Sequence, residues 1–101
     1  MAEVTEISRS AFGRAVASRR AELRLTQEAL SLRSGLHQKW LSNVETARIN
    51  PTLSNLTRLA ASLDMRLSEL ISRAETIEEE RQQTGQTDGA EPGNTRARVS
   101  M

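Results

Sequence analysis

The sequence contains no cysteine and no tyrosine, and it has one histidine, one tryptophan and one phenylalanine. Without cysteine the chain cannot form a disulfide framework or a thiolate metal site. A single histidine without cysteine also falls short of the ligand sets that hold metals in proteins. The residues present offer no nucleophile–base arrangement and no glycine-rich phosphate-binding loop. We therefore expect a protein that is not an enzyme and that binds neither a metal nor a cofactor.

Long hydrophobic runs are missing as well. No apolar stretch approaches the roughly 20 residues that a membrane-spanning helix needs. The N-terminal residues 1–7 lack the basic start and the apolar core of a signal peptide. A length of 101 residues allows one domain at most. These features favour a soluble, cytoplasmic, single-domain protein that does not contact a membrane.

Charge is distributed unevenly along the chain, although the net charge is only +1. Residues 9–50 include eight basic and three acidic side chains, whereas residues 51–91 include four basic and eight acidic ones. A one-sided basic surface is typical of proteins that bind a polyanion. The N-terminal half is therefore the candidate for such binding.

The apolar residues recur at helical spacing, and no stretch alternates as a strand does. A first helix is expected to begin after Ser8 or Ser10 and to end near Leu23. Glycine inside a helix costs about 1 kcal/mol relative to alanine. We therefore expect Gly13, which lies within this helix, to mark a close contact with another helix.

The stretch 25–53 predicts two short helices joined by a tight turn. Thr26 can cap the first helix, because its hydroxyl can accept an otherwise unpaired backbone N–H. Gly35 ends that helix where a left-handed residue is usually needed. The second helix runs from about Gln38 to Glu45. Two helices joined in this way form a helix-turn-helix, whose second helix can lie in the major groove of DNA.

Two further helices and a polar tail follow. Thr52 is the expected N-cap of a fourth helix, and Ser68 that of a fifth helix that continues to about Arg81. Asp64 between them is a residue type that tolerates a left-handed conformation. The apolar face of the fourth helix is predicted to comprise Leu53, Leu56, Leu59, Ala60 and Leu63. We assign residues 8–74 to the helix-turn-helix domain, 75–81 to a helical extension, and 82–101 to a disordered tail of polar composition.

The chain resembles the Cro and phage-repressor (XRE-type) class of helix-turn-helix regulators over residues 12–71. The supporting motifs, in chain order, are L-T-Q-E-A-L, S-G-L, W-L-S-N-V-E, N-P-T-L and L-A-A-S-L-D-M. The resemblance implies an all-α, compact five-helix, lambda-repressor-like domain whose second and third helices contact DNA. Two positions depart from the family, which commonly has glycine where this chain has Ala47 and Asp64.

The resemblance also implies roles for individual residues. Gln38, Lys39 and Asn43 fall at positions that usually contact base edges. Their chemistry suits that role, because a glutamine amide can pair with adenine and a lysine ammonium can donate to guanine. The alternative is that they are ordinary solvated side chains. Arg20 and Glu45 fall where the family often places an ion pair between the first and third helices.

Phosphate contacts set the register of a protein on the duplex without specifying sequence. Trp40 is expected to be half-buried near the phosphates, with a core position as the alternative, and His37 could instead cap the third helix. The expected phosphate-contacting residues are Gln27, His37, Trp40, Thr46, Arg48 and Asn50. In contrast, we expect Arg19, Arg24 and the run 78–80 to be solvated.

These features predict a sequence-specific, double-stranded DNA-binding transcription regulator, a repressor that binds an inverted-repeat operator as a homodimer. Candidate dimer surfaces are the loop around Ile49 and the helix from Leu67 to Ile77. The alternative is an antitoxin-type module that neutralises a toxin-like protein partner and represses its own operon. In that case, the acidic segment after Ile71 is expected to bind the partner.

Overall fold

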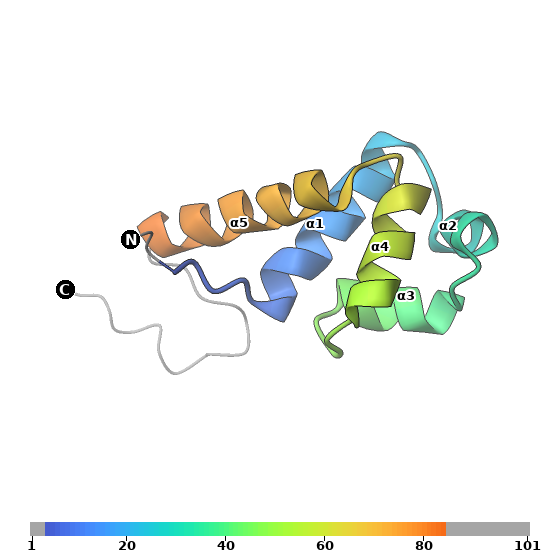
Figure 1. Cartoon of the computed structure of the whole chain (residues 1–101), viewed down its shortest axis with the longest axis horizontal. Helices are drawn as coiled ribbons and strands as arrows, with labels where there is room; N and C mark the ends of the chain where they lie inside the picture. Colours follow the sequence, from blue (N-terminus) through green and yellow to red (C-terminus); the bar gives the residue numbers. More distant parts are fainter. Residues whose placement is uncertain (1–3, 85–101) are drawn as a thin grey trace.

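The computed structural model describes residues 4–84, which contain five helices and no strand. The helices are α1 (Arg9–Glu22), α2 (Gln27–Ser34), α3 (Gln38–Glu45), α4 (Leu53–Ser62) and α5 (Leu67–Thr84). The expected all-α, five-helix fold is therefore confirmed. Helix α5 lies across α1, and α2, α3 and α4 gather at the other end of the molecule (Figure 1). No helix in this part of the chain is both long and apolar enough to span a membrane.

Three helices begin at hydroxyl caps that the sequence predicts. The side chains of Ser8, Thr26 and Thr52 accept the backbone N–H three residues ahead at 3.0, 2.9 and 3.2 Å. Each satisfies a donor that the helix itself leaves unpaired, which contributes about 1 kcal/mol. The starts of α1, α2 and α4 therefore follow from local chemistry.

The expected cap of the fifth helix is wrong. Helix α5 begins at Leu67, so Ser68 lies inside the first turn rather than before it. The carboxylate of Glu69 accepts the backbone N–H of Arg66 at 2.8 Å and performs the capping role. A carboxylate near a helix N-terminus is also favoured by the helix dipole.

The hydrophobic core is built from side chains of all five helices. Its larger, fully buried side chains are Val16, Leu30, Leu41, Val44, Leu59, Leu63 and Leu70. The predicted apolar face of α4 is wrong at one position, because Leu53 is 70% exposed. Leu53 is the first residue of the helix and lies beyond the edge of the core. Ile49 and Ile77, the expected dimer-surface residues, are partly buried and pack against the core.

Gly13 lies at the closest approach of α1 to α3, as its position within a helix predicts. A Cβ atom at residue 13 would lie 2.5 Å from the carbonyl oxygen of Val44 and 2.8 Å from that of Glu45. Those atoms belong to the backbone and cannot rotate away as a side chain can. Any residue larger than glycine would therefore force α1 and α3 apart.

The N-terminal residues are attached to the second half of α5. The backbone N–H of Ser8 donates to Glu78 at 3.1 Å, and the Arg81 guanidinium donates to the Ser8 hydroxyl at 3.1 Å. Burial by itself would raise the pKa of Glu78, but the hydrogen bonds from Ser8 and the charge of Arg81 lower it overall. The expectation that 78–80 is solvated is therefore wrong for Glu78, which is buried.

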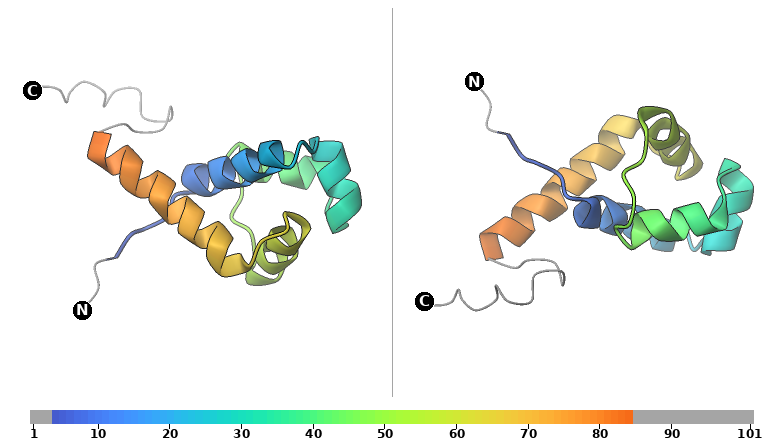
Figure 2. Two further views of the ribbon diagram at one scale, coloured as in Figure 1. Left: turned by 90° about the horizontal axis from the view of Figure 1, so that it is seen from above. Right: turned by 90° about the horizontal axis from the view of Figure 1, so that it is seen from below.

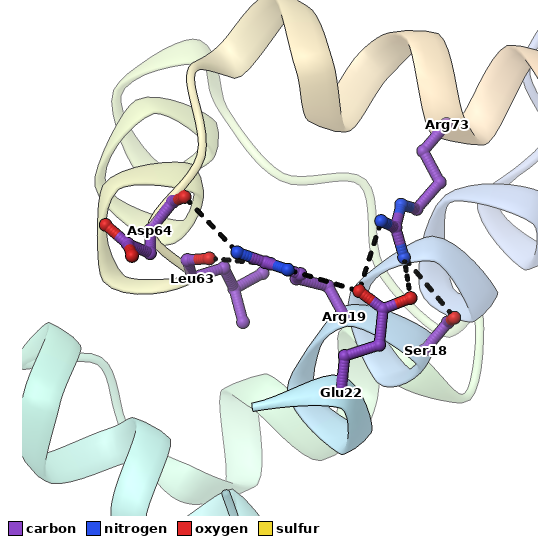
Figure 3. A network of polar contacts seen from close by, with 6 residues as sticks. All are labelled: Ser18, Arg19, Glu22, Leu63, Asp64 and Arg73. Atoms are coloured by element: carbon purple, nitrogen blue, oxygen red, sulfur yellow. Dashed lines mark hydrogen bonds and ion pairs between the residues drawn. The ribbon is translucent and has the colours of Figure 1, made fainter. Parts of the chain in front are cut away.

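Arg19 is a second charged residue whose expected exposure is wrong. Its guanidinium donates to the carbonyl oxygens of Leu63 at 3.0 Å and Asp64 at 3.4 Å, at the end of α4 (Figure 3). Glu22, on the same helix, pairs with Arg73 of α5 at 2.8 Å. The hydrogen bond from Arg73, followed by that from Arg19, lowers the pKa of Glu22. These contacts connect α1 with both α4 and α5.

Helix α5 continues without a break to Thr84. Residues 82–84, which we expected to belong to a disordered tail, are therefore helical. The remainder of that tail, residues 85–101, lies outside the described residues.

Gly13→Ala should destabilise the protein by about 1–3 kcal/mol, because the added methyl group overpacks a backbone-to-backbone contact. This is opposite to the effect expected for the same change at an uncrowded helix position. Chemical denaturation measures the difference. Ala21→Ser adds one atom at an exposed position of the same helix and should change the stability by less than about 0.5 kcal/mol. A more stable Gly13→Ala variant would contradict the close contact.

The free energy of unfolding should decrease at acidic pH, in part because Glu78 becomes protonated. Its folded-state pKa lies below the ordinary value of 4.5, so its contribution is complete above that pH and is lost as the pH falls through the folded pKa. Glu78→Gln should therefore cost about 1 kcal/mol at pH 7 and clearly less at pH 3. Urea denaturation at several pH values tests this. Glu80→Gln, at an exposed position of the same helix, is the control, and an equal cost of Glu78→Gln at both pH values would refute the assignment.

Candidate nucleic-acid interface

The turn between α2 and α3 determines how α3 is presented. Gly35 has a left-handed φ of 75° and donates its N–H to the carbonyl of Ser31 at 2.9 Å, which ends α2. The Ser31 hydroxyl then donates to the carbonyl of Leu36 at 2.6 Å, and the Leu36 side chain is buried. Leu41 and Val44 bury the inner face of α3. The polar outer face of this helix is therefore directed away from the core.

A shallow groove of about 580 Å³ follows this outer face. Its lining consists entirely of polar or cationic residues from α2, α3 and the loop after α3. These are Gln27, Gln38, Lys39, Ser42, Asn43, Thr46 and Arg48. All three residues expected to contact bases thus line one groove, together with three of the six expected to contact phosphates.

Ser42 is the groove residue that we did not include among the expected contacts. It lies four residues after Gln38 and three after Lys39, so helical spacing alone places it on the same face. This spacing is the sequence feature from which Ser42 could have been predicted to line the groove. Its carbonyl accepts the Thr46 hydroxyl at 2.8 Å, and this bond orients Thr46 at the end of α3.

The remaining expected phosphate contacts lie around the groove. Trp40 is half-buried and packs against the core, so its burial is as predicted, whereas its contact with phosphates stays a prediction. His37 occupies the N-cap position of α3, but its exposed side chain makes no capping hydrogen bond. Asn50 is exposed and lines a neighbouring concavity with Pro51 at the start of α4. The structure thus places Trp40, His37 and Asn50 outside the groove that Gln38 and Lys39 line.

The carboxylate of Glu45 connects α1, α2 and α3. Arg20 donates to both of its oxygens, at 2.7 and 2.9 Å, and the Gln27 amide donates to Oε1 at 3.0 Å. The Arg20 guanidinium also donates to the carbonyl of Leu25 at 2.8 Å. The Glu45 side chain is only 7% exposed, and its hydrogen bond raises the pKa of Arg20. This bidentate pair therefore holds Gln27 beside α3.

The loop after α3 contains a left-handed residue with a side chain. Ala47 has a φ of 65°, and Asp64 after α4 has a φ of 60°. These are the two positions at which the resemblance described above implies glycine. The loop still closes normally, since the N–H of Arg48 donates to the carbonyl of Asn43 at 2.8 Å. Each left-handed residue with a side chain costs about 1–2 kcal/mol in backbone strain.

Comparison with known proteins places this geometry in a family. A model of the helix-turn-helix family HTH_3 matches residues 16–70. An HTH-type transcriptional regulator of Sinorhizobium fredii is 41% identical over 64 residues, which are 63% of this chain and 83% of the relative. The immunity repressor of Bacillus phage phi105 is 32% identical over 67% of this chain, which spans about half of the repressor's length (47%).

A solved structure agrees. The restriction-modification controller protein C.AhdI of Aeromonas hydrophila superposes with a TM-score of 0.60 and is 34% identical. The match covers 61% of this chain and 94% of the controller protein. The resemblance inferred from the sequence motifs is thus confirmed by independent sequence and structural similarity.

Arg20→Ala should cost about 3 kcal/mol, because it leaves the carboxylate of Glu45 buried without its partner. Arg20→Met combined with Glu45→Leu should cost less than either of these substitutions alone, because no buried charge remains. Thermal and urea denaturation of Arg20→Met, Glu45→Leu and the double variant complete a double-mutant cycle with the wild type. Additive effects of the two substitutions would show that the pair does not couple α1 to α3.

Proposed function

The chain belongs to the HTH_3 helix-turn-helix family of DNA-binding transcription regulators, and on this premise we propose that it is a sequence-specific repressor. It binds double-stranded DNA by inserting α3 into the major groove. Its operator is an inverted repeat that two copies of the chain occupy. The observation that carries the proposal is the groove along α3, in which amide and ammonium groups from neighbouring turns line one surface.

The chemistry of α3 supports direct contact with bases. The exposed side chains of Gln38 and Lys39 lie on the first turn, at the end of a recognition helix that usually approaches base edges. Gln38 suits adenine, which presents one donor and one acceptor in the major groove, and Lys39 suits the two acceptors of guanine. Asn43 lies one turn further along and extends the contact in the same direction.

The surrounding residues support contacts with the DNA backbone. Arg48 is exposed after α3, and Gln27 lines the same groove from α2, where its amide donates to Glu45. Contacts with the DNA backbone position a recognition helix along the duplex. We assign the same role to His37, Trp40, Thr46 and Asn50.

The name of one relative, a phage immunity repressor, supports repression as the regulatory effect. Repression by a small DNA-binding domain requires only that it occupy an operator in competition with other proteins. A domain of this kind therefore needs no catalytic group.

Dimerisation follows from the small size of the recognition unit. Helix α3 has eight residues and offers few base contacts, whereas two copies related by a twofold axis read two half-sites about 34 Å apart. Of the two candidate surfaces, α5 has an open groove of about 600 Å³ that includes Met65, Ser72 and Ile77. We therefore favour the α5 surface over the Ile49 loop as the dimer contact.

The antitoxin-type alternative depends on the acidic residues after Ile71. Glu78, within that segment, is buried against Ser8 rather than free to meet a partner. This contact reduces the acidic surface of α5 that could bind a toxin-like protein. The DNA-binding proposal, by comparison, uses side chains that are exposed in the groove.

Lys39→Ala should relax the preference at one base pair of each half-site, at a cost of about 1–3 kcal/mol on the best sequence. Arg48→Ala should instead weaken binding to all sequences alike and make the affinity less dependent on salt. Selection from a random DNA pool, followed by titrations between 50 and 200 mM salt, measures both effects. An equal loss on every sequence for Lys39→Ala would reassign Lys39 to the phosphates.

Two protomers should bind each selected operator, and the selected sequence should have inverted symmetry. Sedimentation of the protein with and without the operator measures the stoichiometry. A bulky, charged substitution in the α5 groove, Ser72→Lys, should weaken the dimer, whereas Ser54→Lys at an exposed position of α4 is the control. Saturation at one protomer on an asymmetric site would rule out the dimer.

A further inference from the structure

We propose that Arg9, in the first turn of α1, contacts a DNA phosphate and extends the interface beyond α3 and its following loop. This inference rests on the proposed function. It assigns a role to a helix that the sequence motifs do not connect with DNA. The partner is the sugar–phosphate backbone just outside the base pairs that α3 contacts.

The contact between α1 and α3 places Arg9 near the interface. Gly13 touches the carbonyl groups of Val44 and Glu45, where α3 ends. Arg9 precedes Gly13 by four residues, so the two share one face of α1. Arg9 therefore lies one turn of α1 away from the point at which α1 contacts the end of α3.

A small concavity also places Arg9 near the end of the loop between α3 and α4. Arg9 lines it together with Asn50 and Pro51, which belong to the end of that loop. Arg48, two residues before Asn50, lines the groove along α3. Figure 2 (right) shows the first turn of α1 beside α3 on one face of the molecule. The loop after α3 thus joins the groove along α3 to this concavity, whose remaining lining residues are Ile7, Ser8, Phe12, Leu56 and Ile71.

The electrostatic setting leaves Arg9 available for an anion. Its side chain is exposed, and within residues 4–84 no hydrogen bond or ion pair engages it. A cation near a helix N-terminus is disfavoured by the helix dipole, so Arg9 does not stabilise α1 locally. A guanidinium matches phosphate geometry with paired N–H donors. A phosphate at this position would pair with the guanidinium, because the start of α1 itself is already occupied by the carboxylate of Glu78 on the N–H of Ser8.

The experiment compares salt dependence of DNA binding among four proteins. These are the full-length wild type, Arg9→Gln, Arg9→Lys and Arg66→Gln. Arg66 is also an exposed arginine, but it lies in the turn between α4 and α5, at the opposite end of α4 from the loop after α3. Affinities for the selected operator and for an unrelated duplex are measured between 50 and 200 mM salt, with the melting temperature of each protein.

We expect Arg9→Gln to reduce the slope of log affinity against log salt by about 1 for each bound protomer, and so by about 2 for the dimer on its operator. The affinity loss of the dimer should then be about tenfold larger at 50 mM than at 200 mM salt. Arg9→Lys should keep the wild-type slope because it keeps the charge. Arg66→Gln should also keep it, and the melting temperature of Arg9→Gln should not fall.

Three results would overturn the inference. One is salt-dependent wild-type binding with an unchanged slope for Arg9→Gln, which would leave the proposed function intact. Another is an equal change for Arg9→Gln and Arg66→Gln, which would show a general effect of net charge. The last is a wild-type protein whose binding does not depend on salt, which would remove the proposed function together with the role of Arg9.

Discussion

The carboxylate of Glu45 is the interaction on which the arrangement of the DNA-binding helices depends. It lies on α3, accepts two hydrogen bonds from Arg20 of α1, and accepts a third from Gln27 of α2. An eight-residue helix is marginal by itself in water, so tertiary contacts must hold α3 in place. A nearly buried ion pair is specific in direction because any other geometry leaves a charge unpaired. The orientation of α3 therefore follows from the geometry of one carboxylate.

Gly13 supplies the steric counterpart of that polar contact. Because residue 13 has no Cβ, the backbones of α1 and α3 meet directly, and the Arg20 guanidinium can then reach Glu45 one to two turns further along α1. The same approach carries the N-terminus of α1 to the loop after α3. The glycine at position 13 thus allows both the Arg20–Glu45 ion pair and the surface that we assign to DNA binding to form.

Prediction from sequence succeeded for the features that depend on residues close together in the chain. Thr26, Gly35 and Thr52 act as predicted because caps and left-handed turns involve residues only a few positions apart. Helical spacing also brought the expected base-contacting residues to one groove. It failed at Leu53, whose burial depends on where the core ends rather than on periodicity. Arg9 carries no motif, and its position emerges only from the contact between α1 and α3.

The sequence by itself determined the helices, the caps of α2 and α4, the helix-turn-helix and the family, because these follow from local chemistry and from motifs in a recognisable order. The tertiary structure decided which charged side chains are paired and which are solvated. Arg19 binds the carbonyl of Leu63, 44 residues away, and Ser8 binds Glu78, 70 residues away. The sequence pattern of a charged helical residue is the same whether its side chain is solvated or paired with a distant group. Its partner is determined by chain packing, which brings together groups that no local pattern relates.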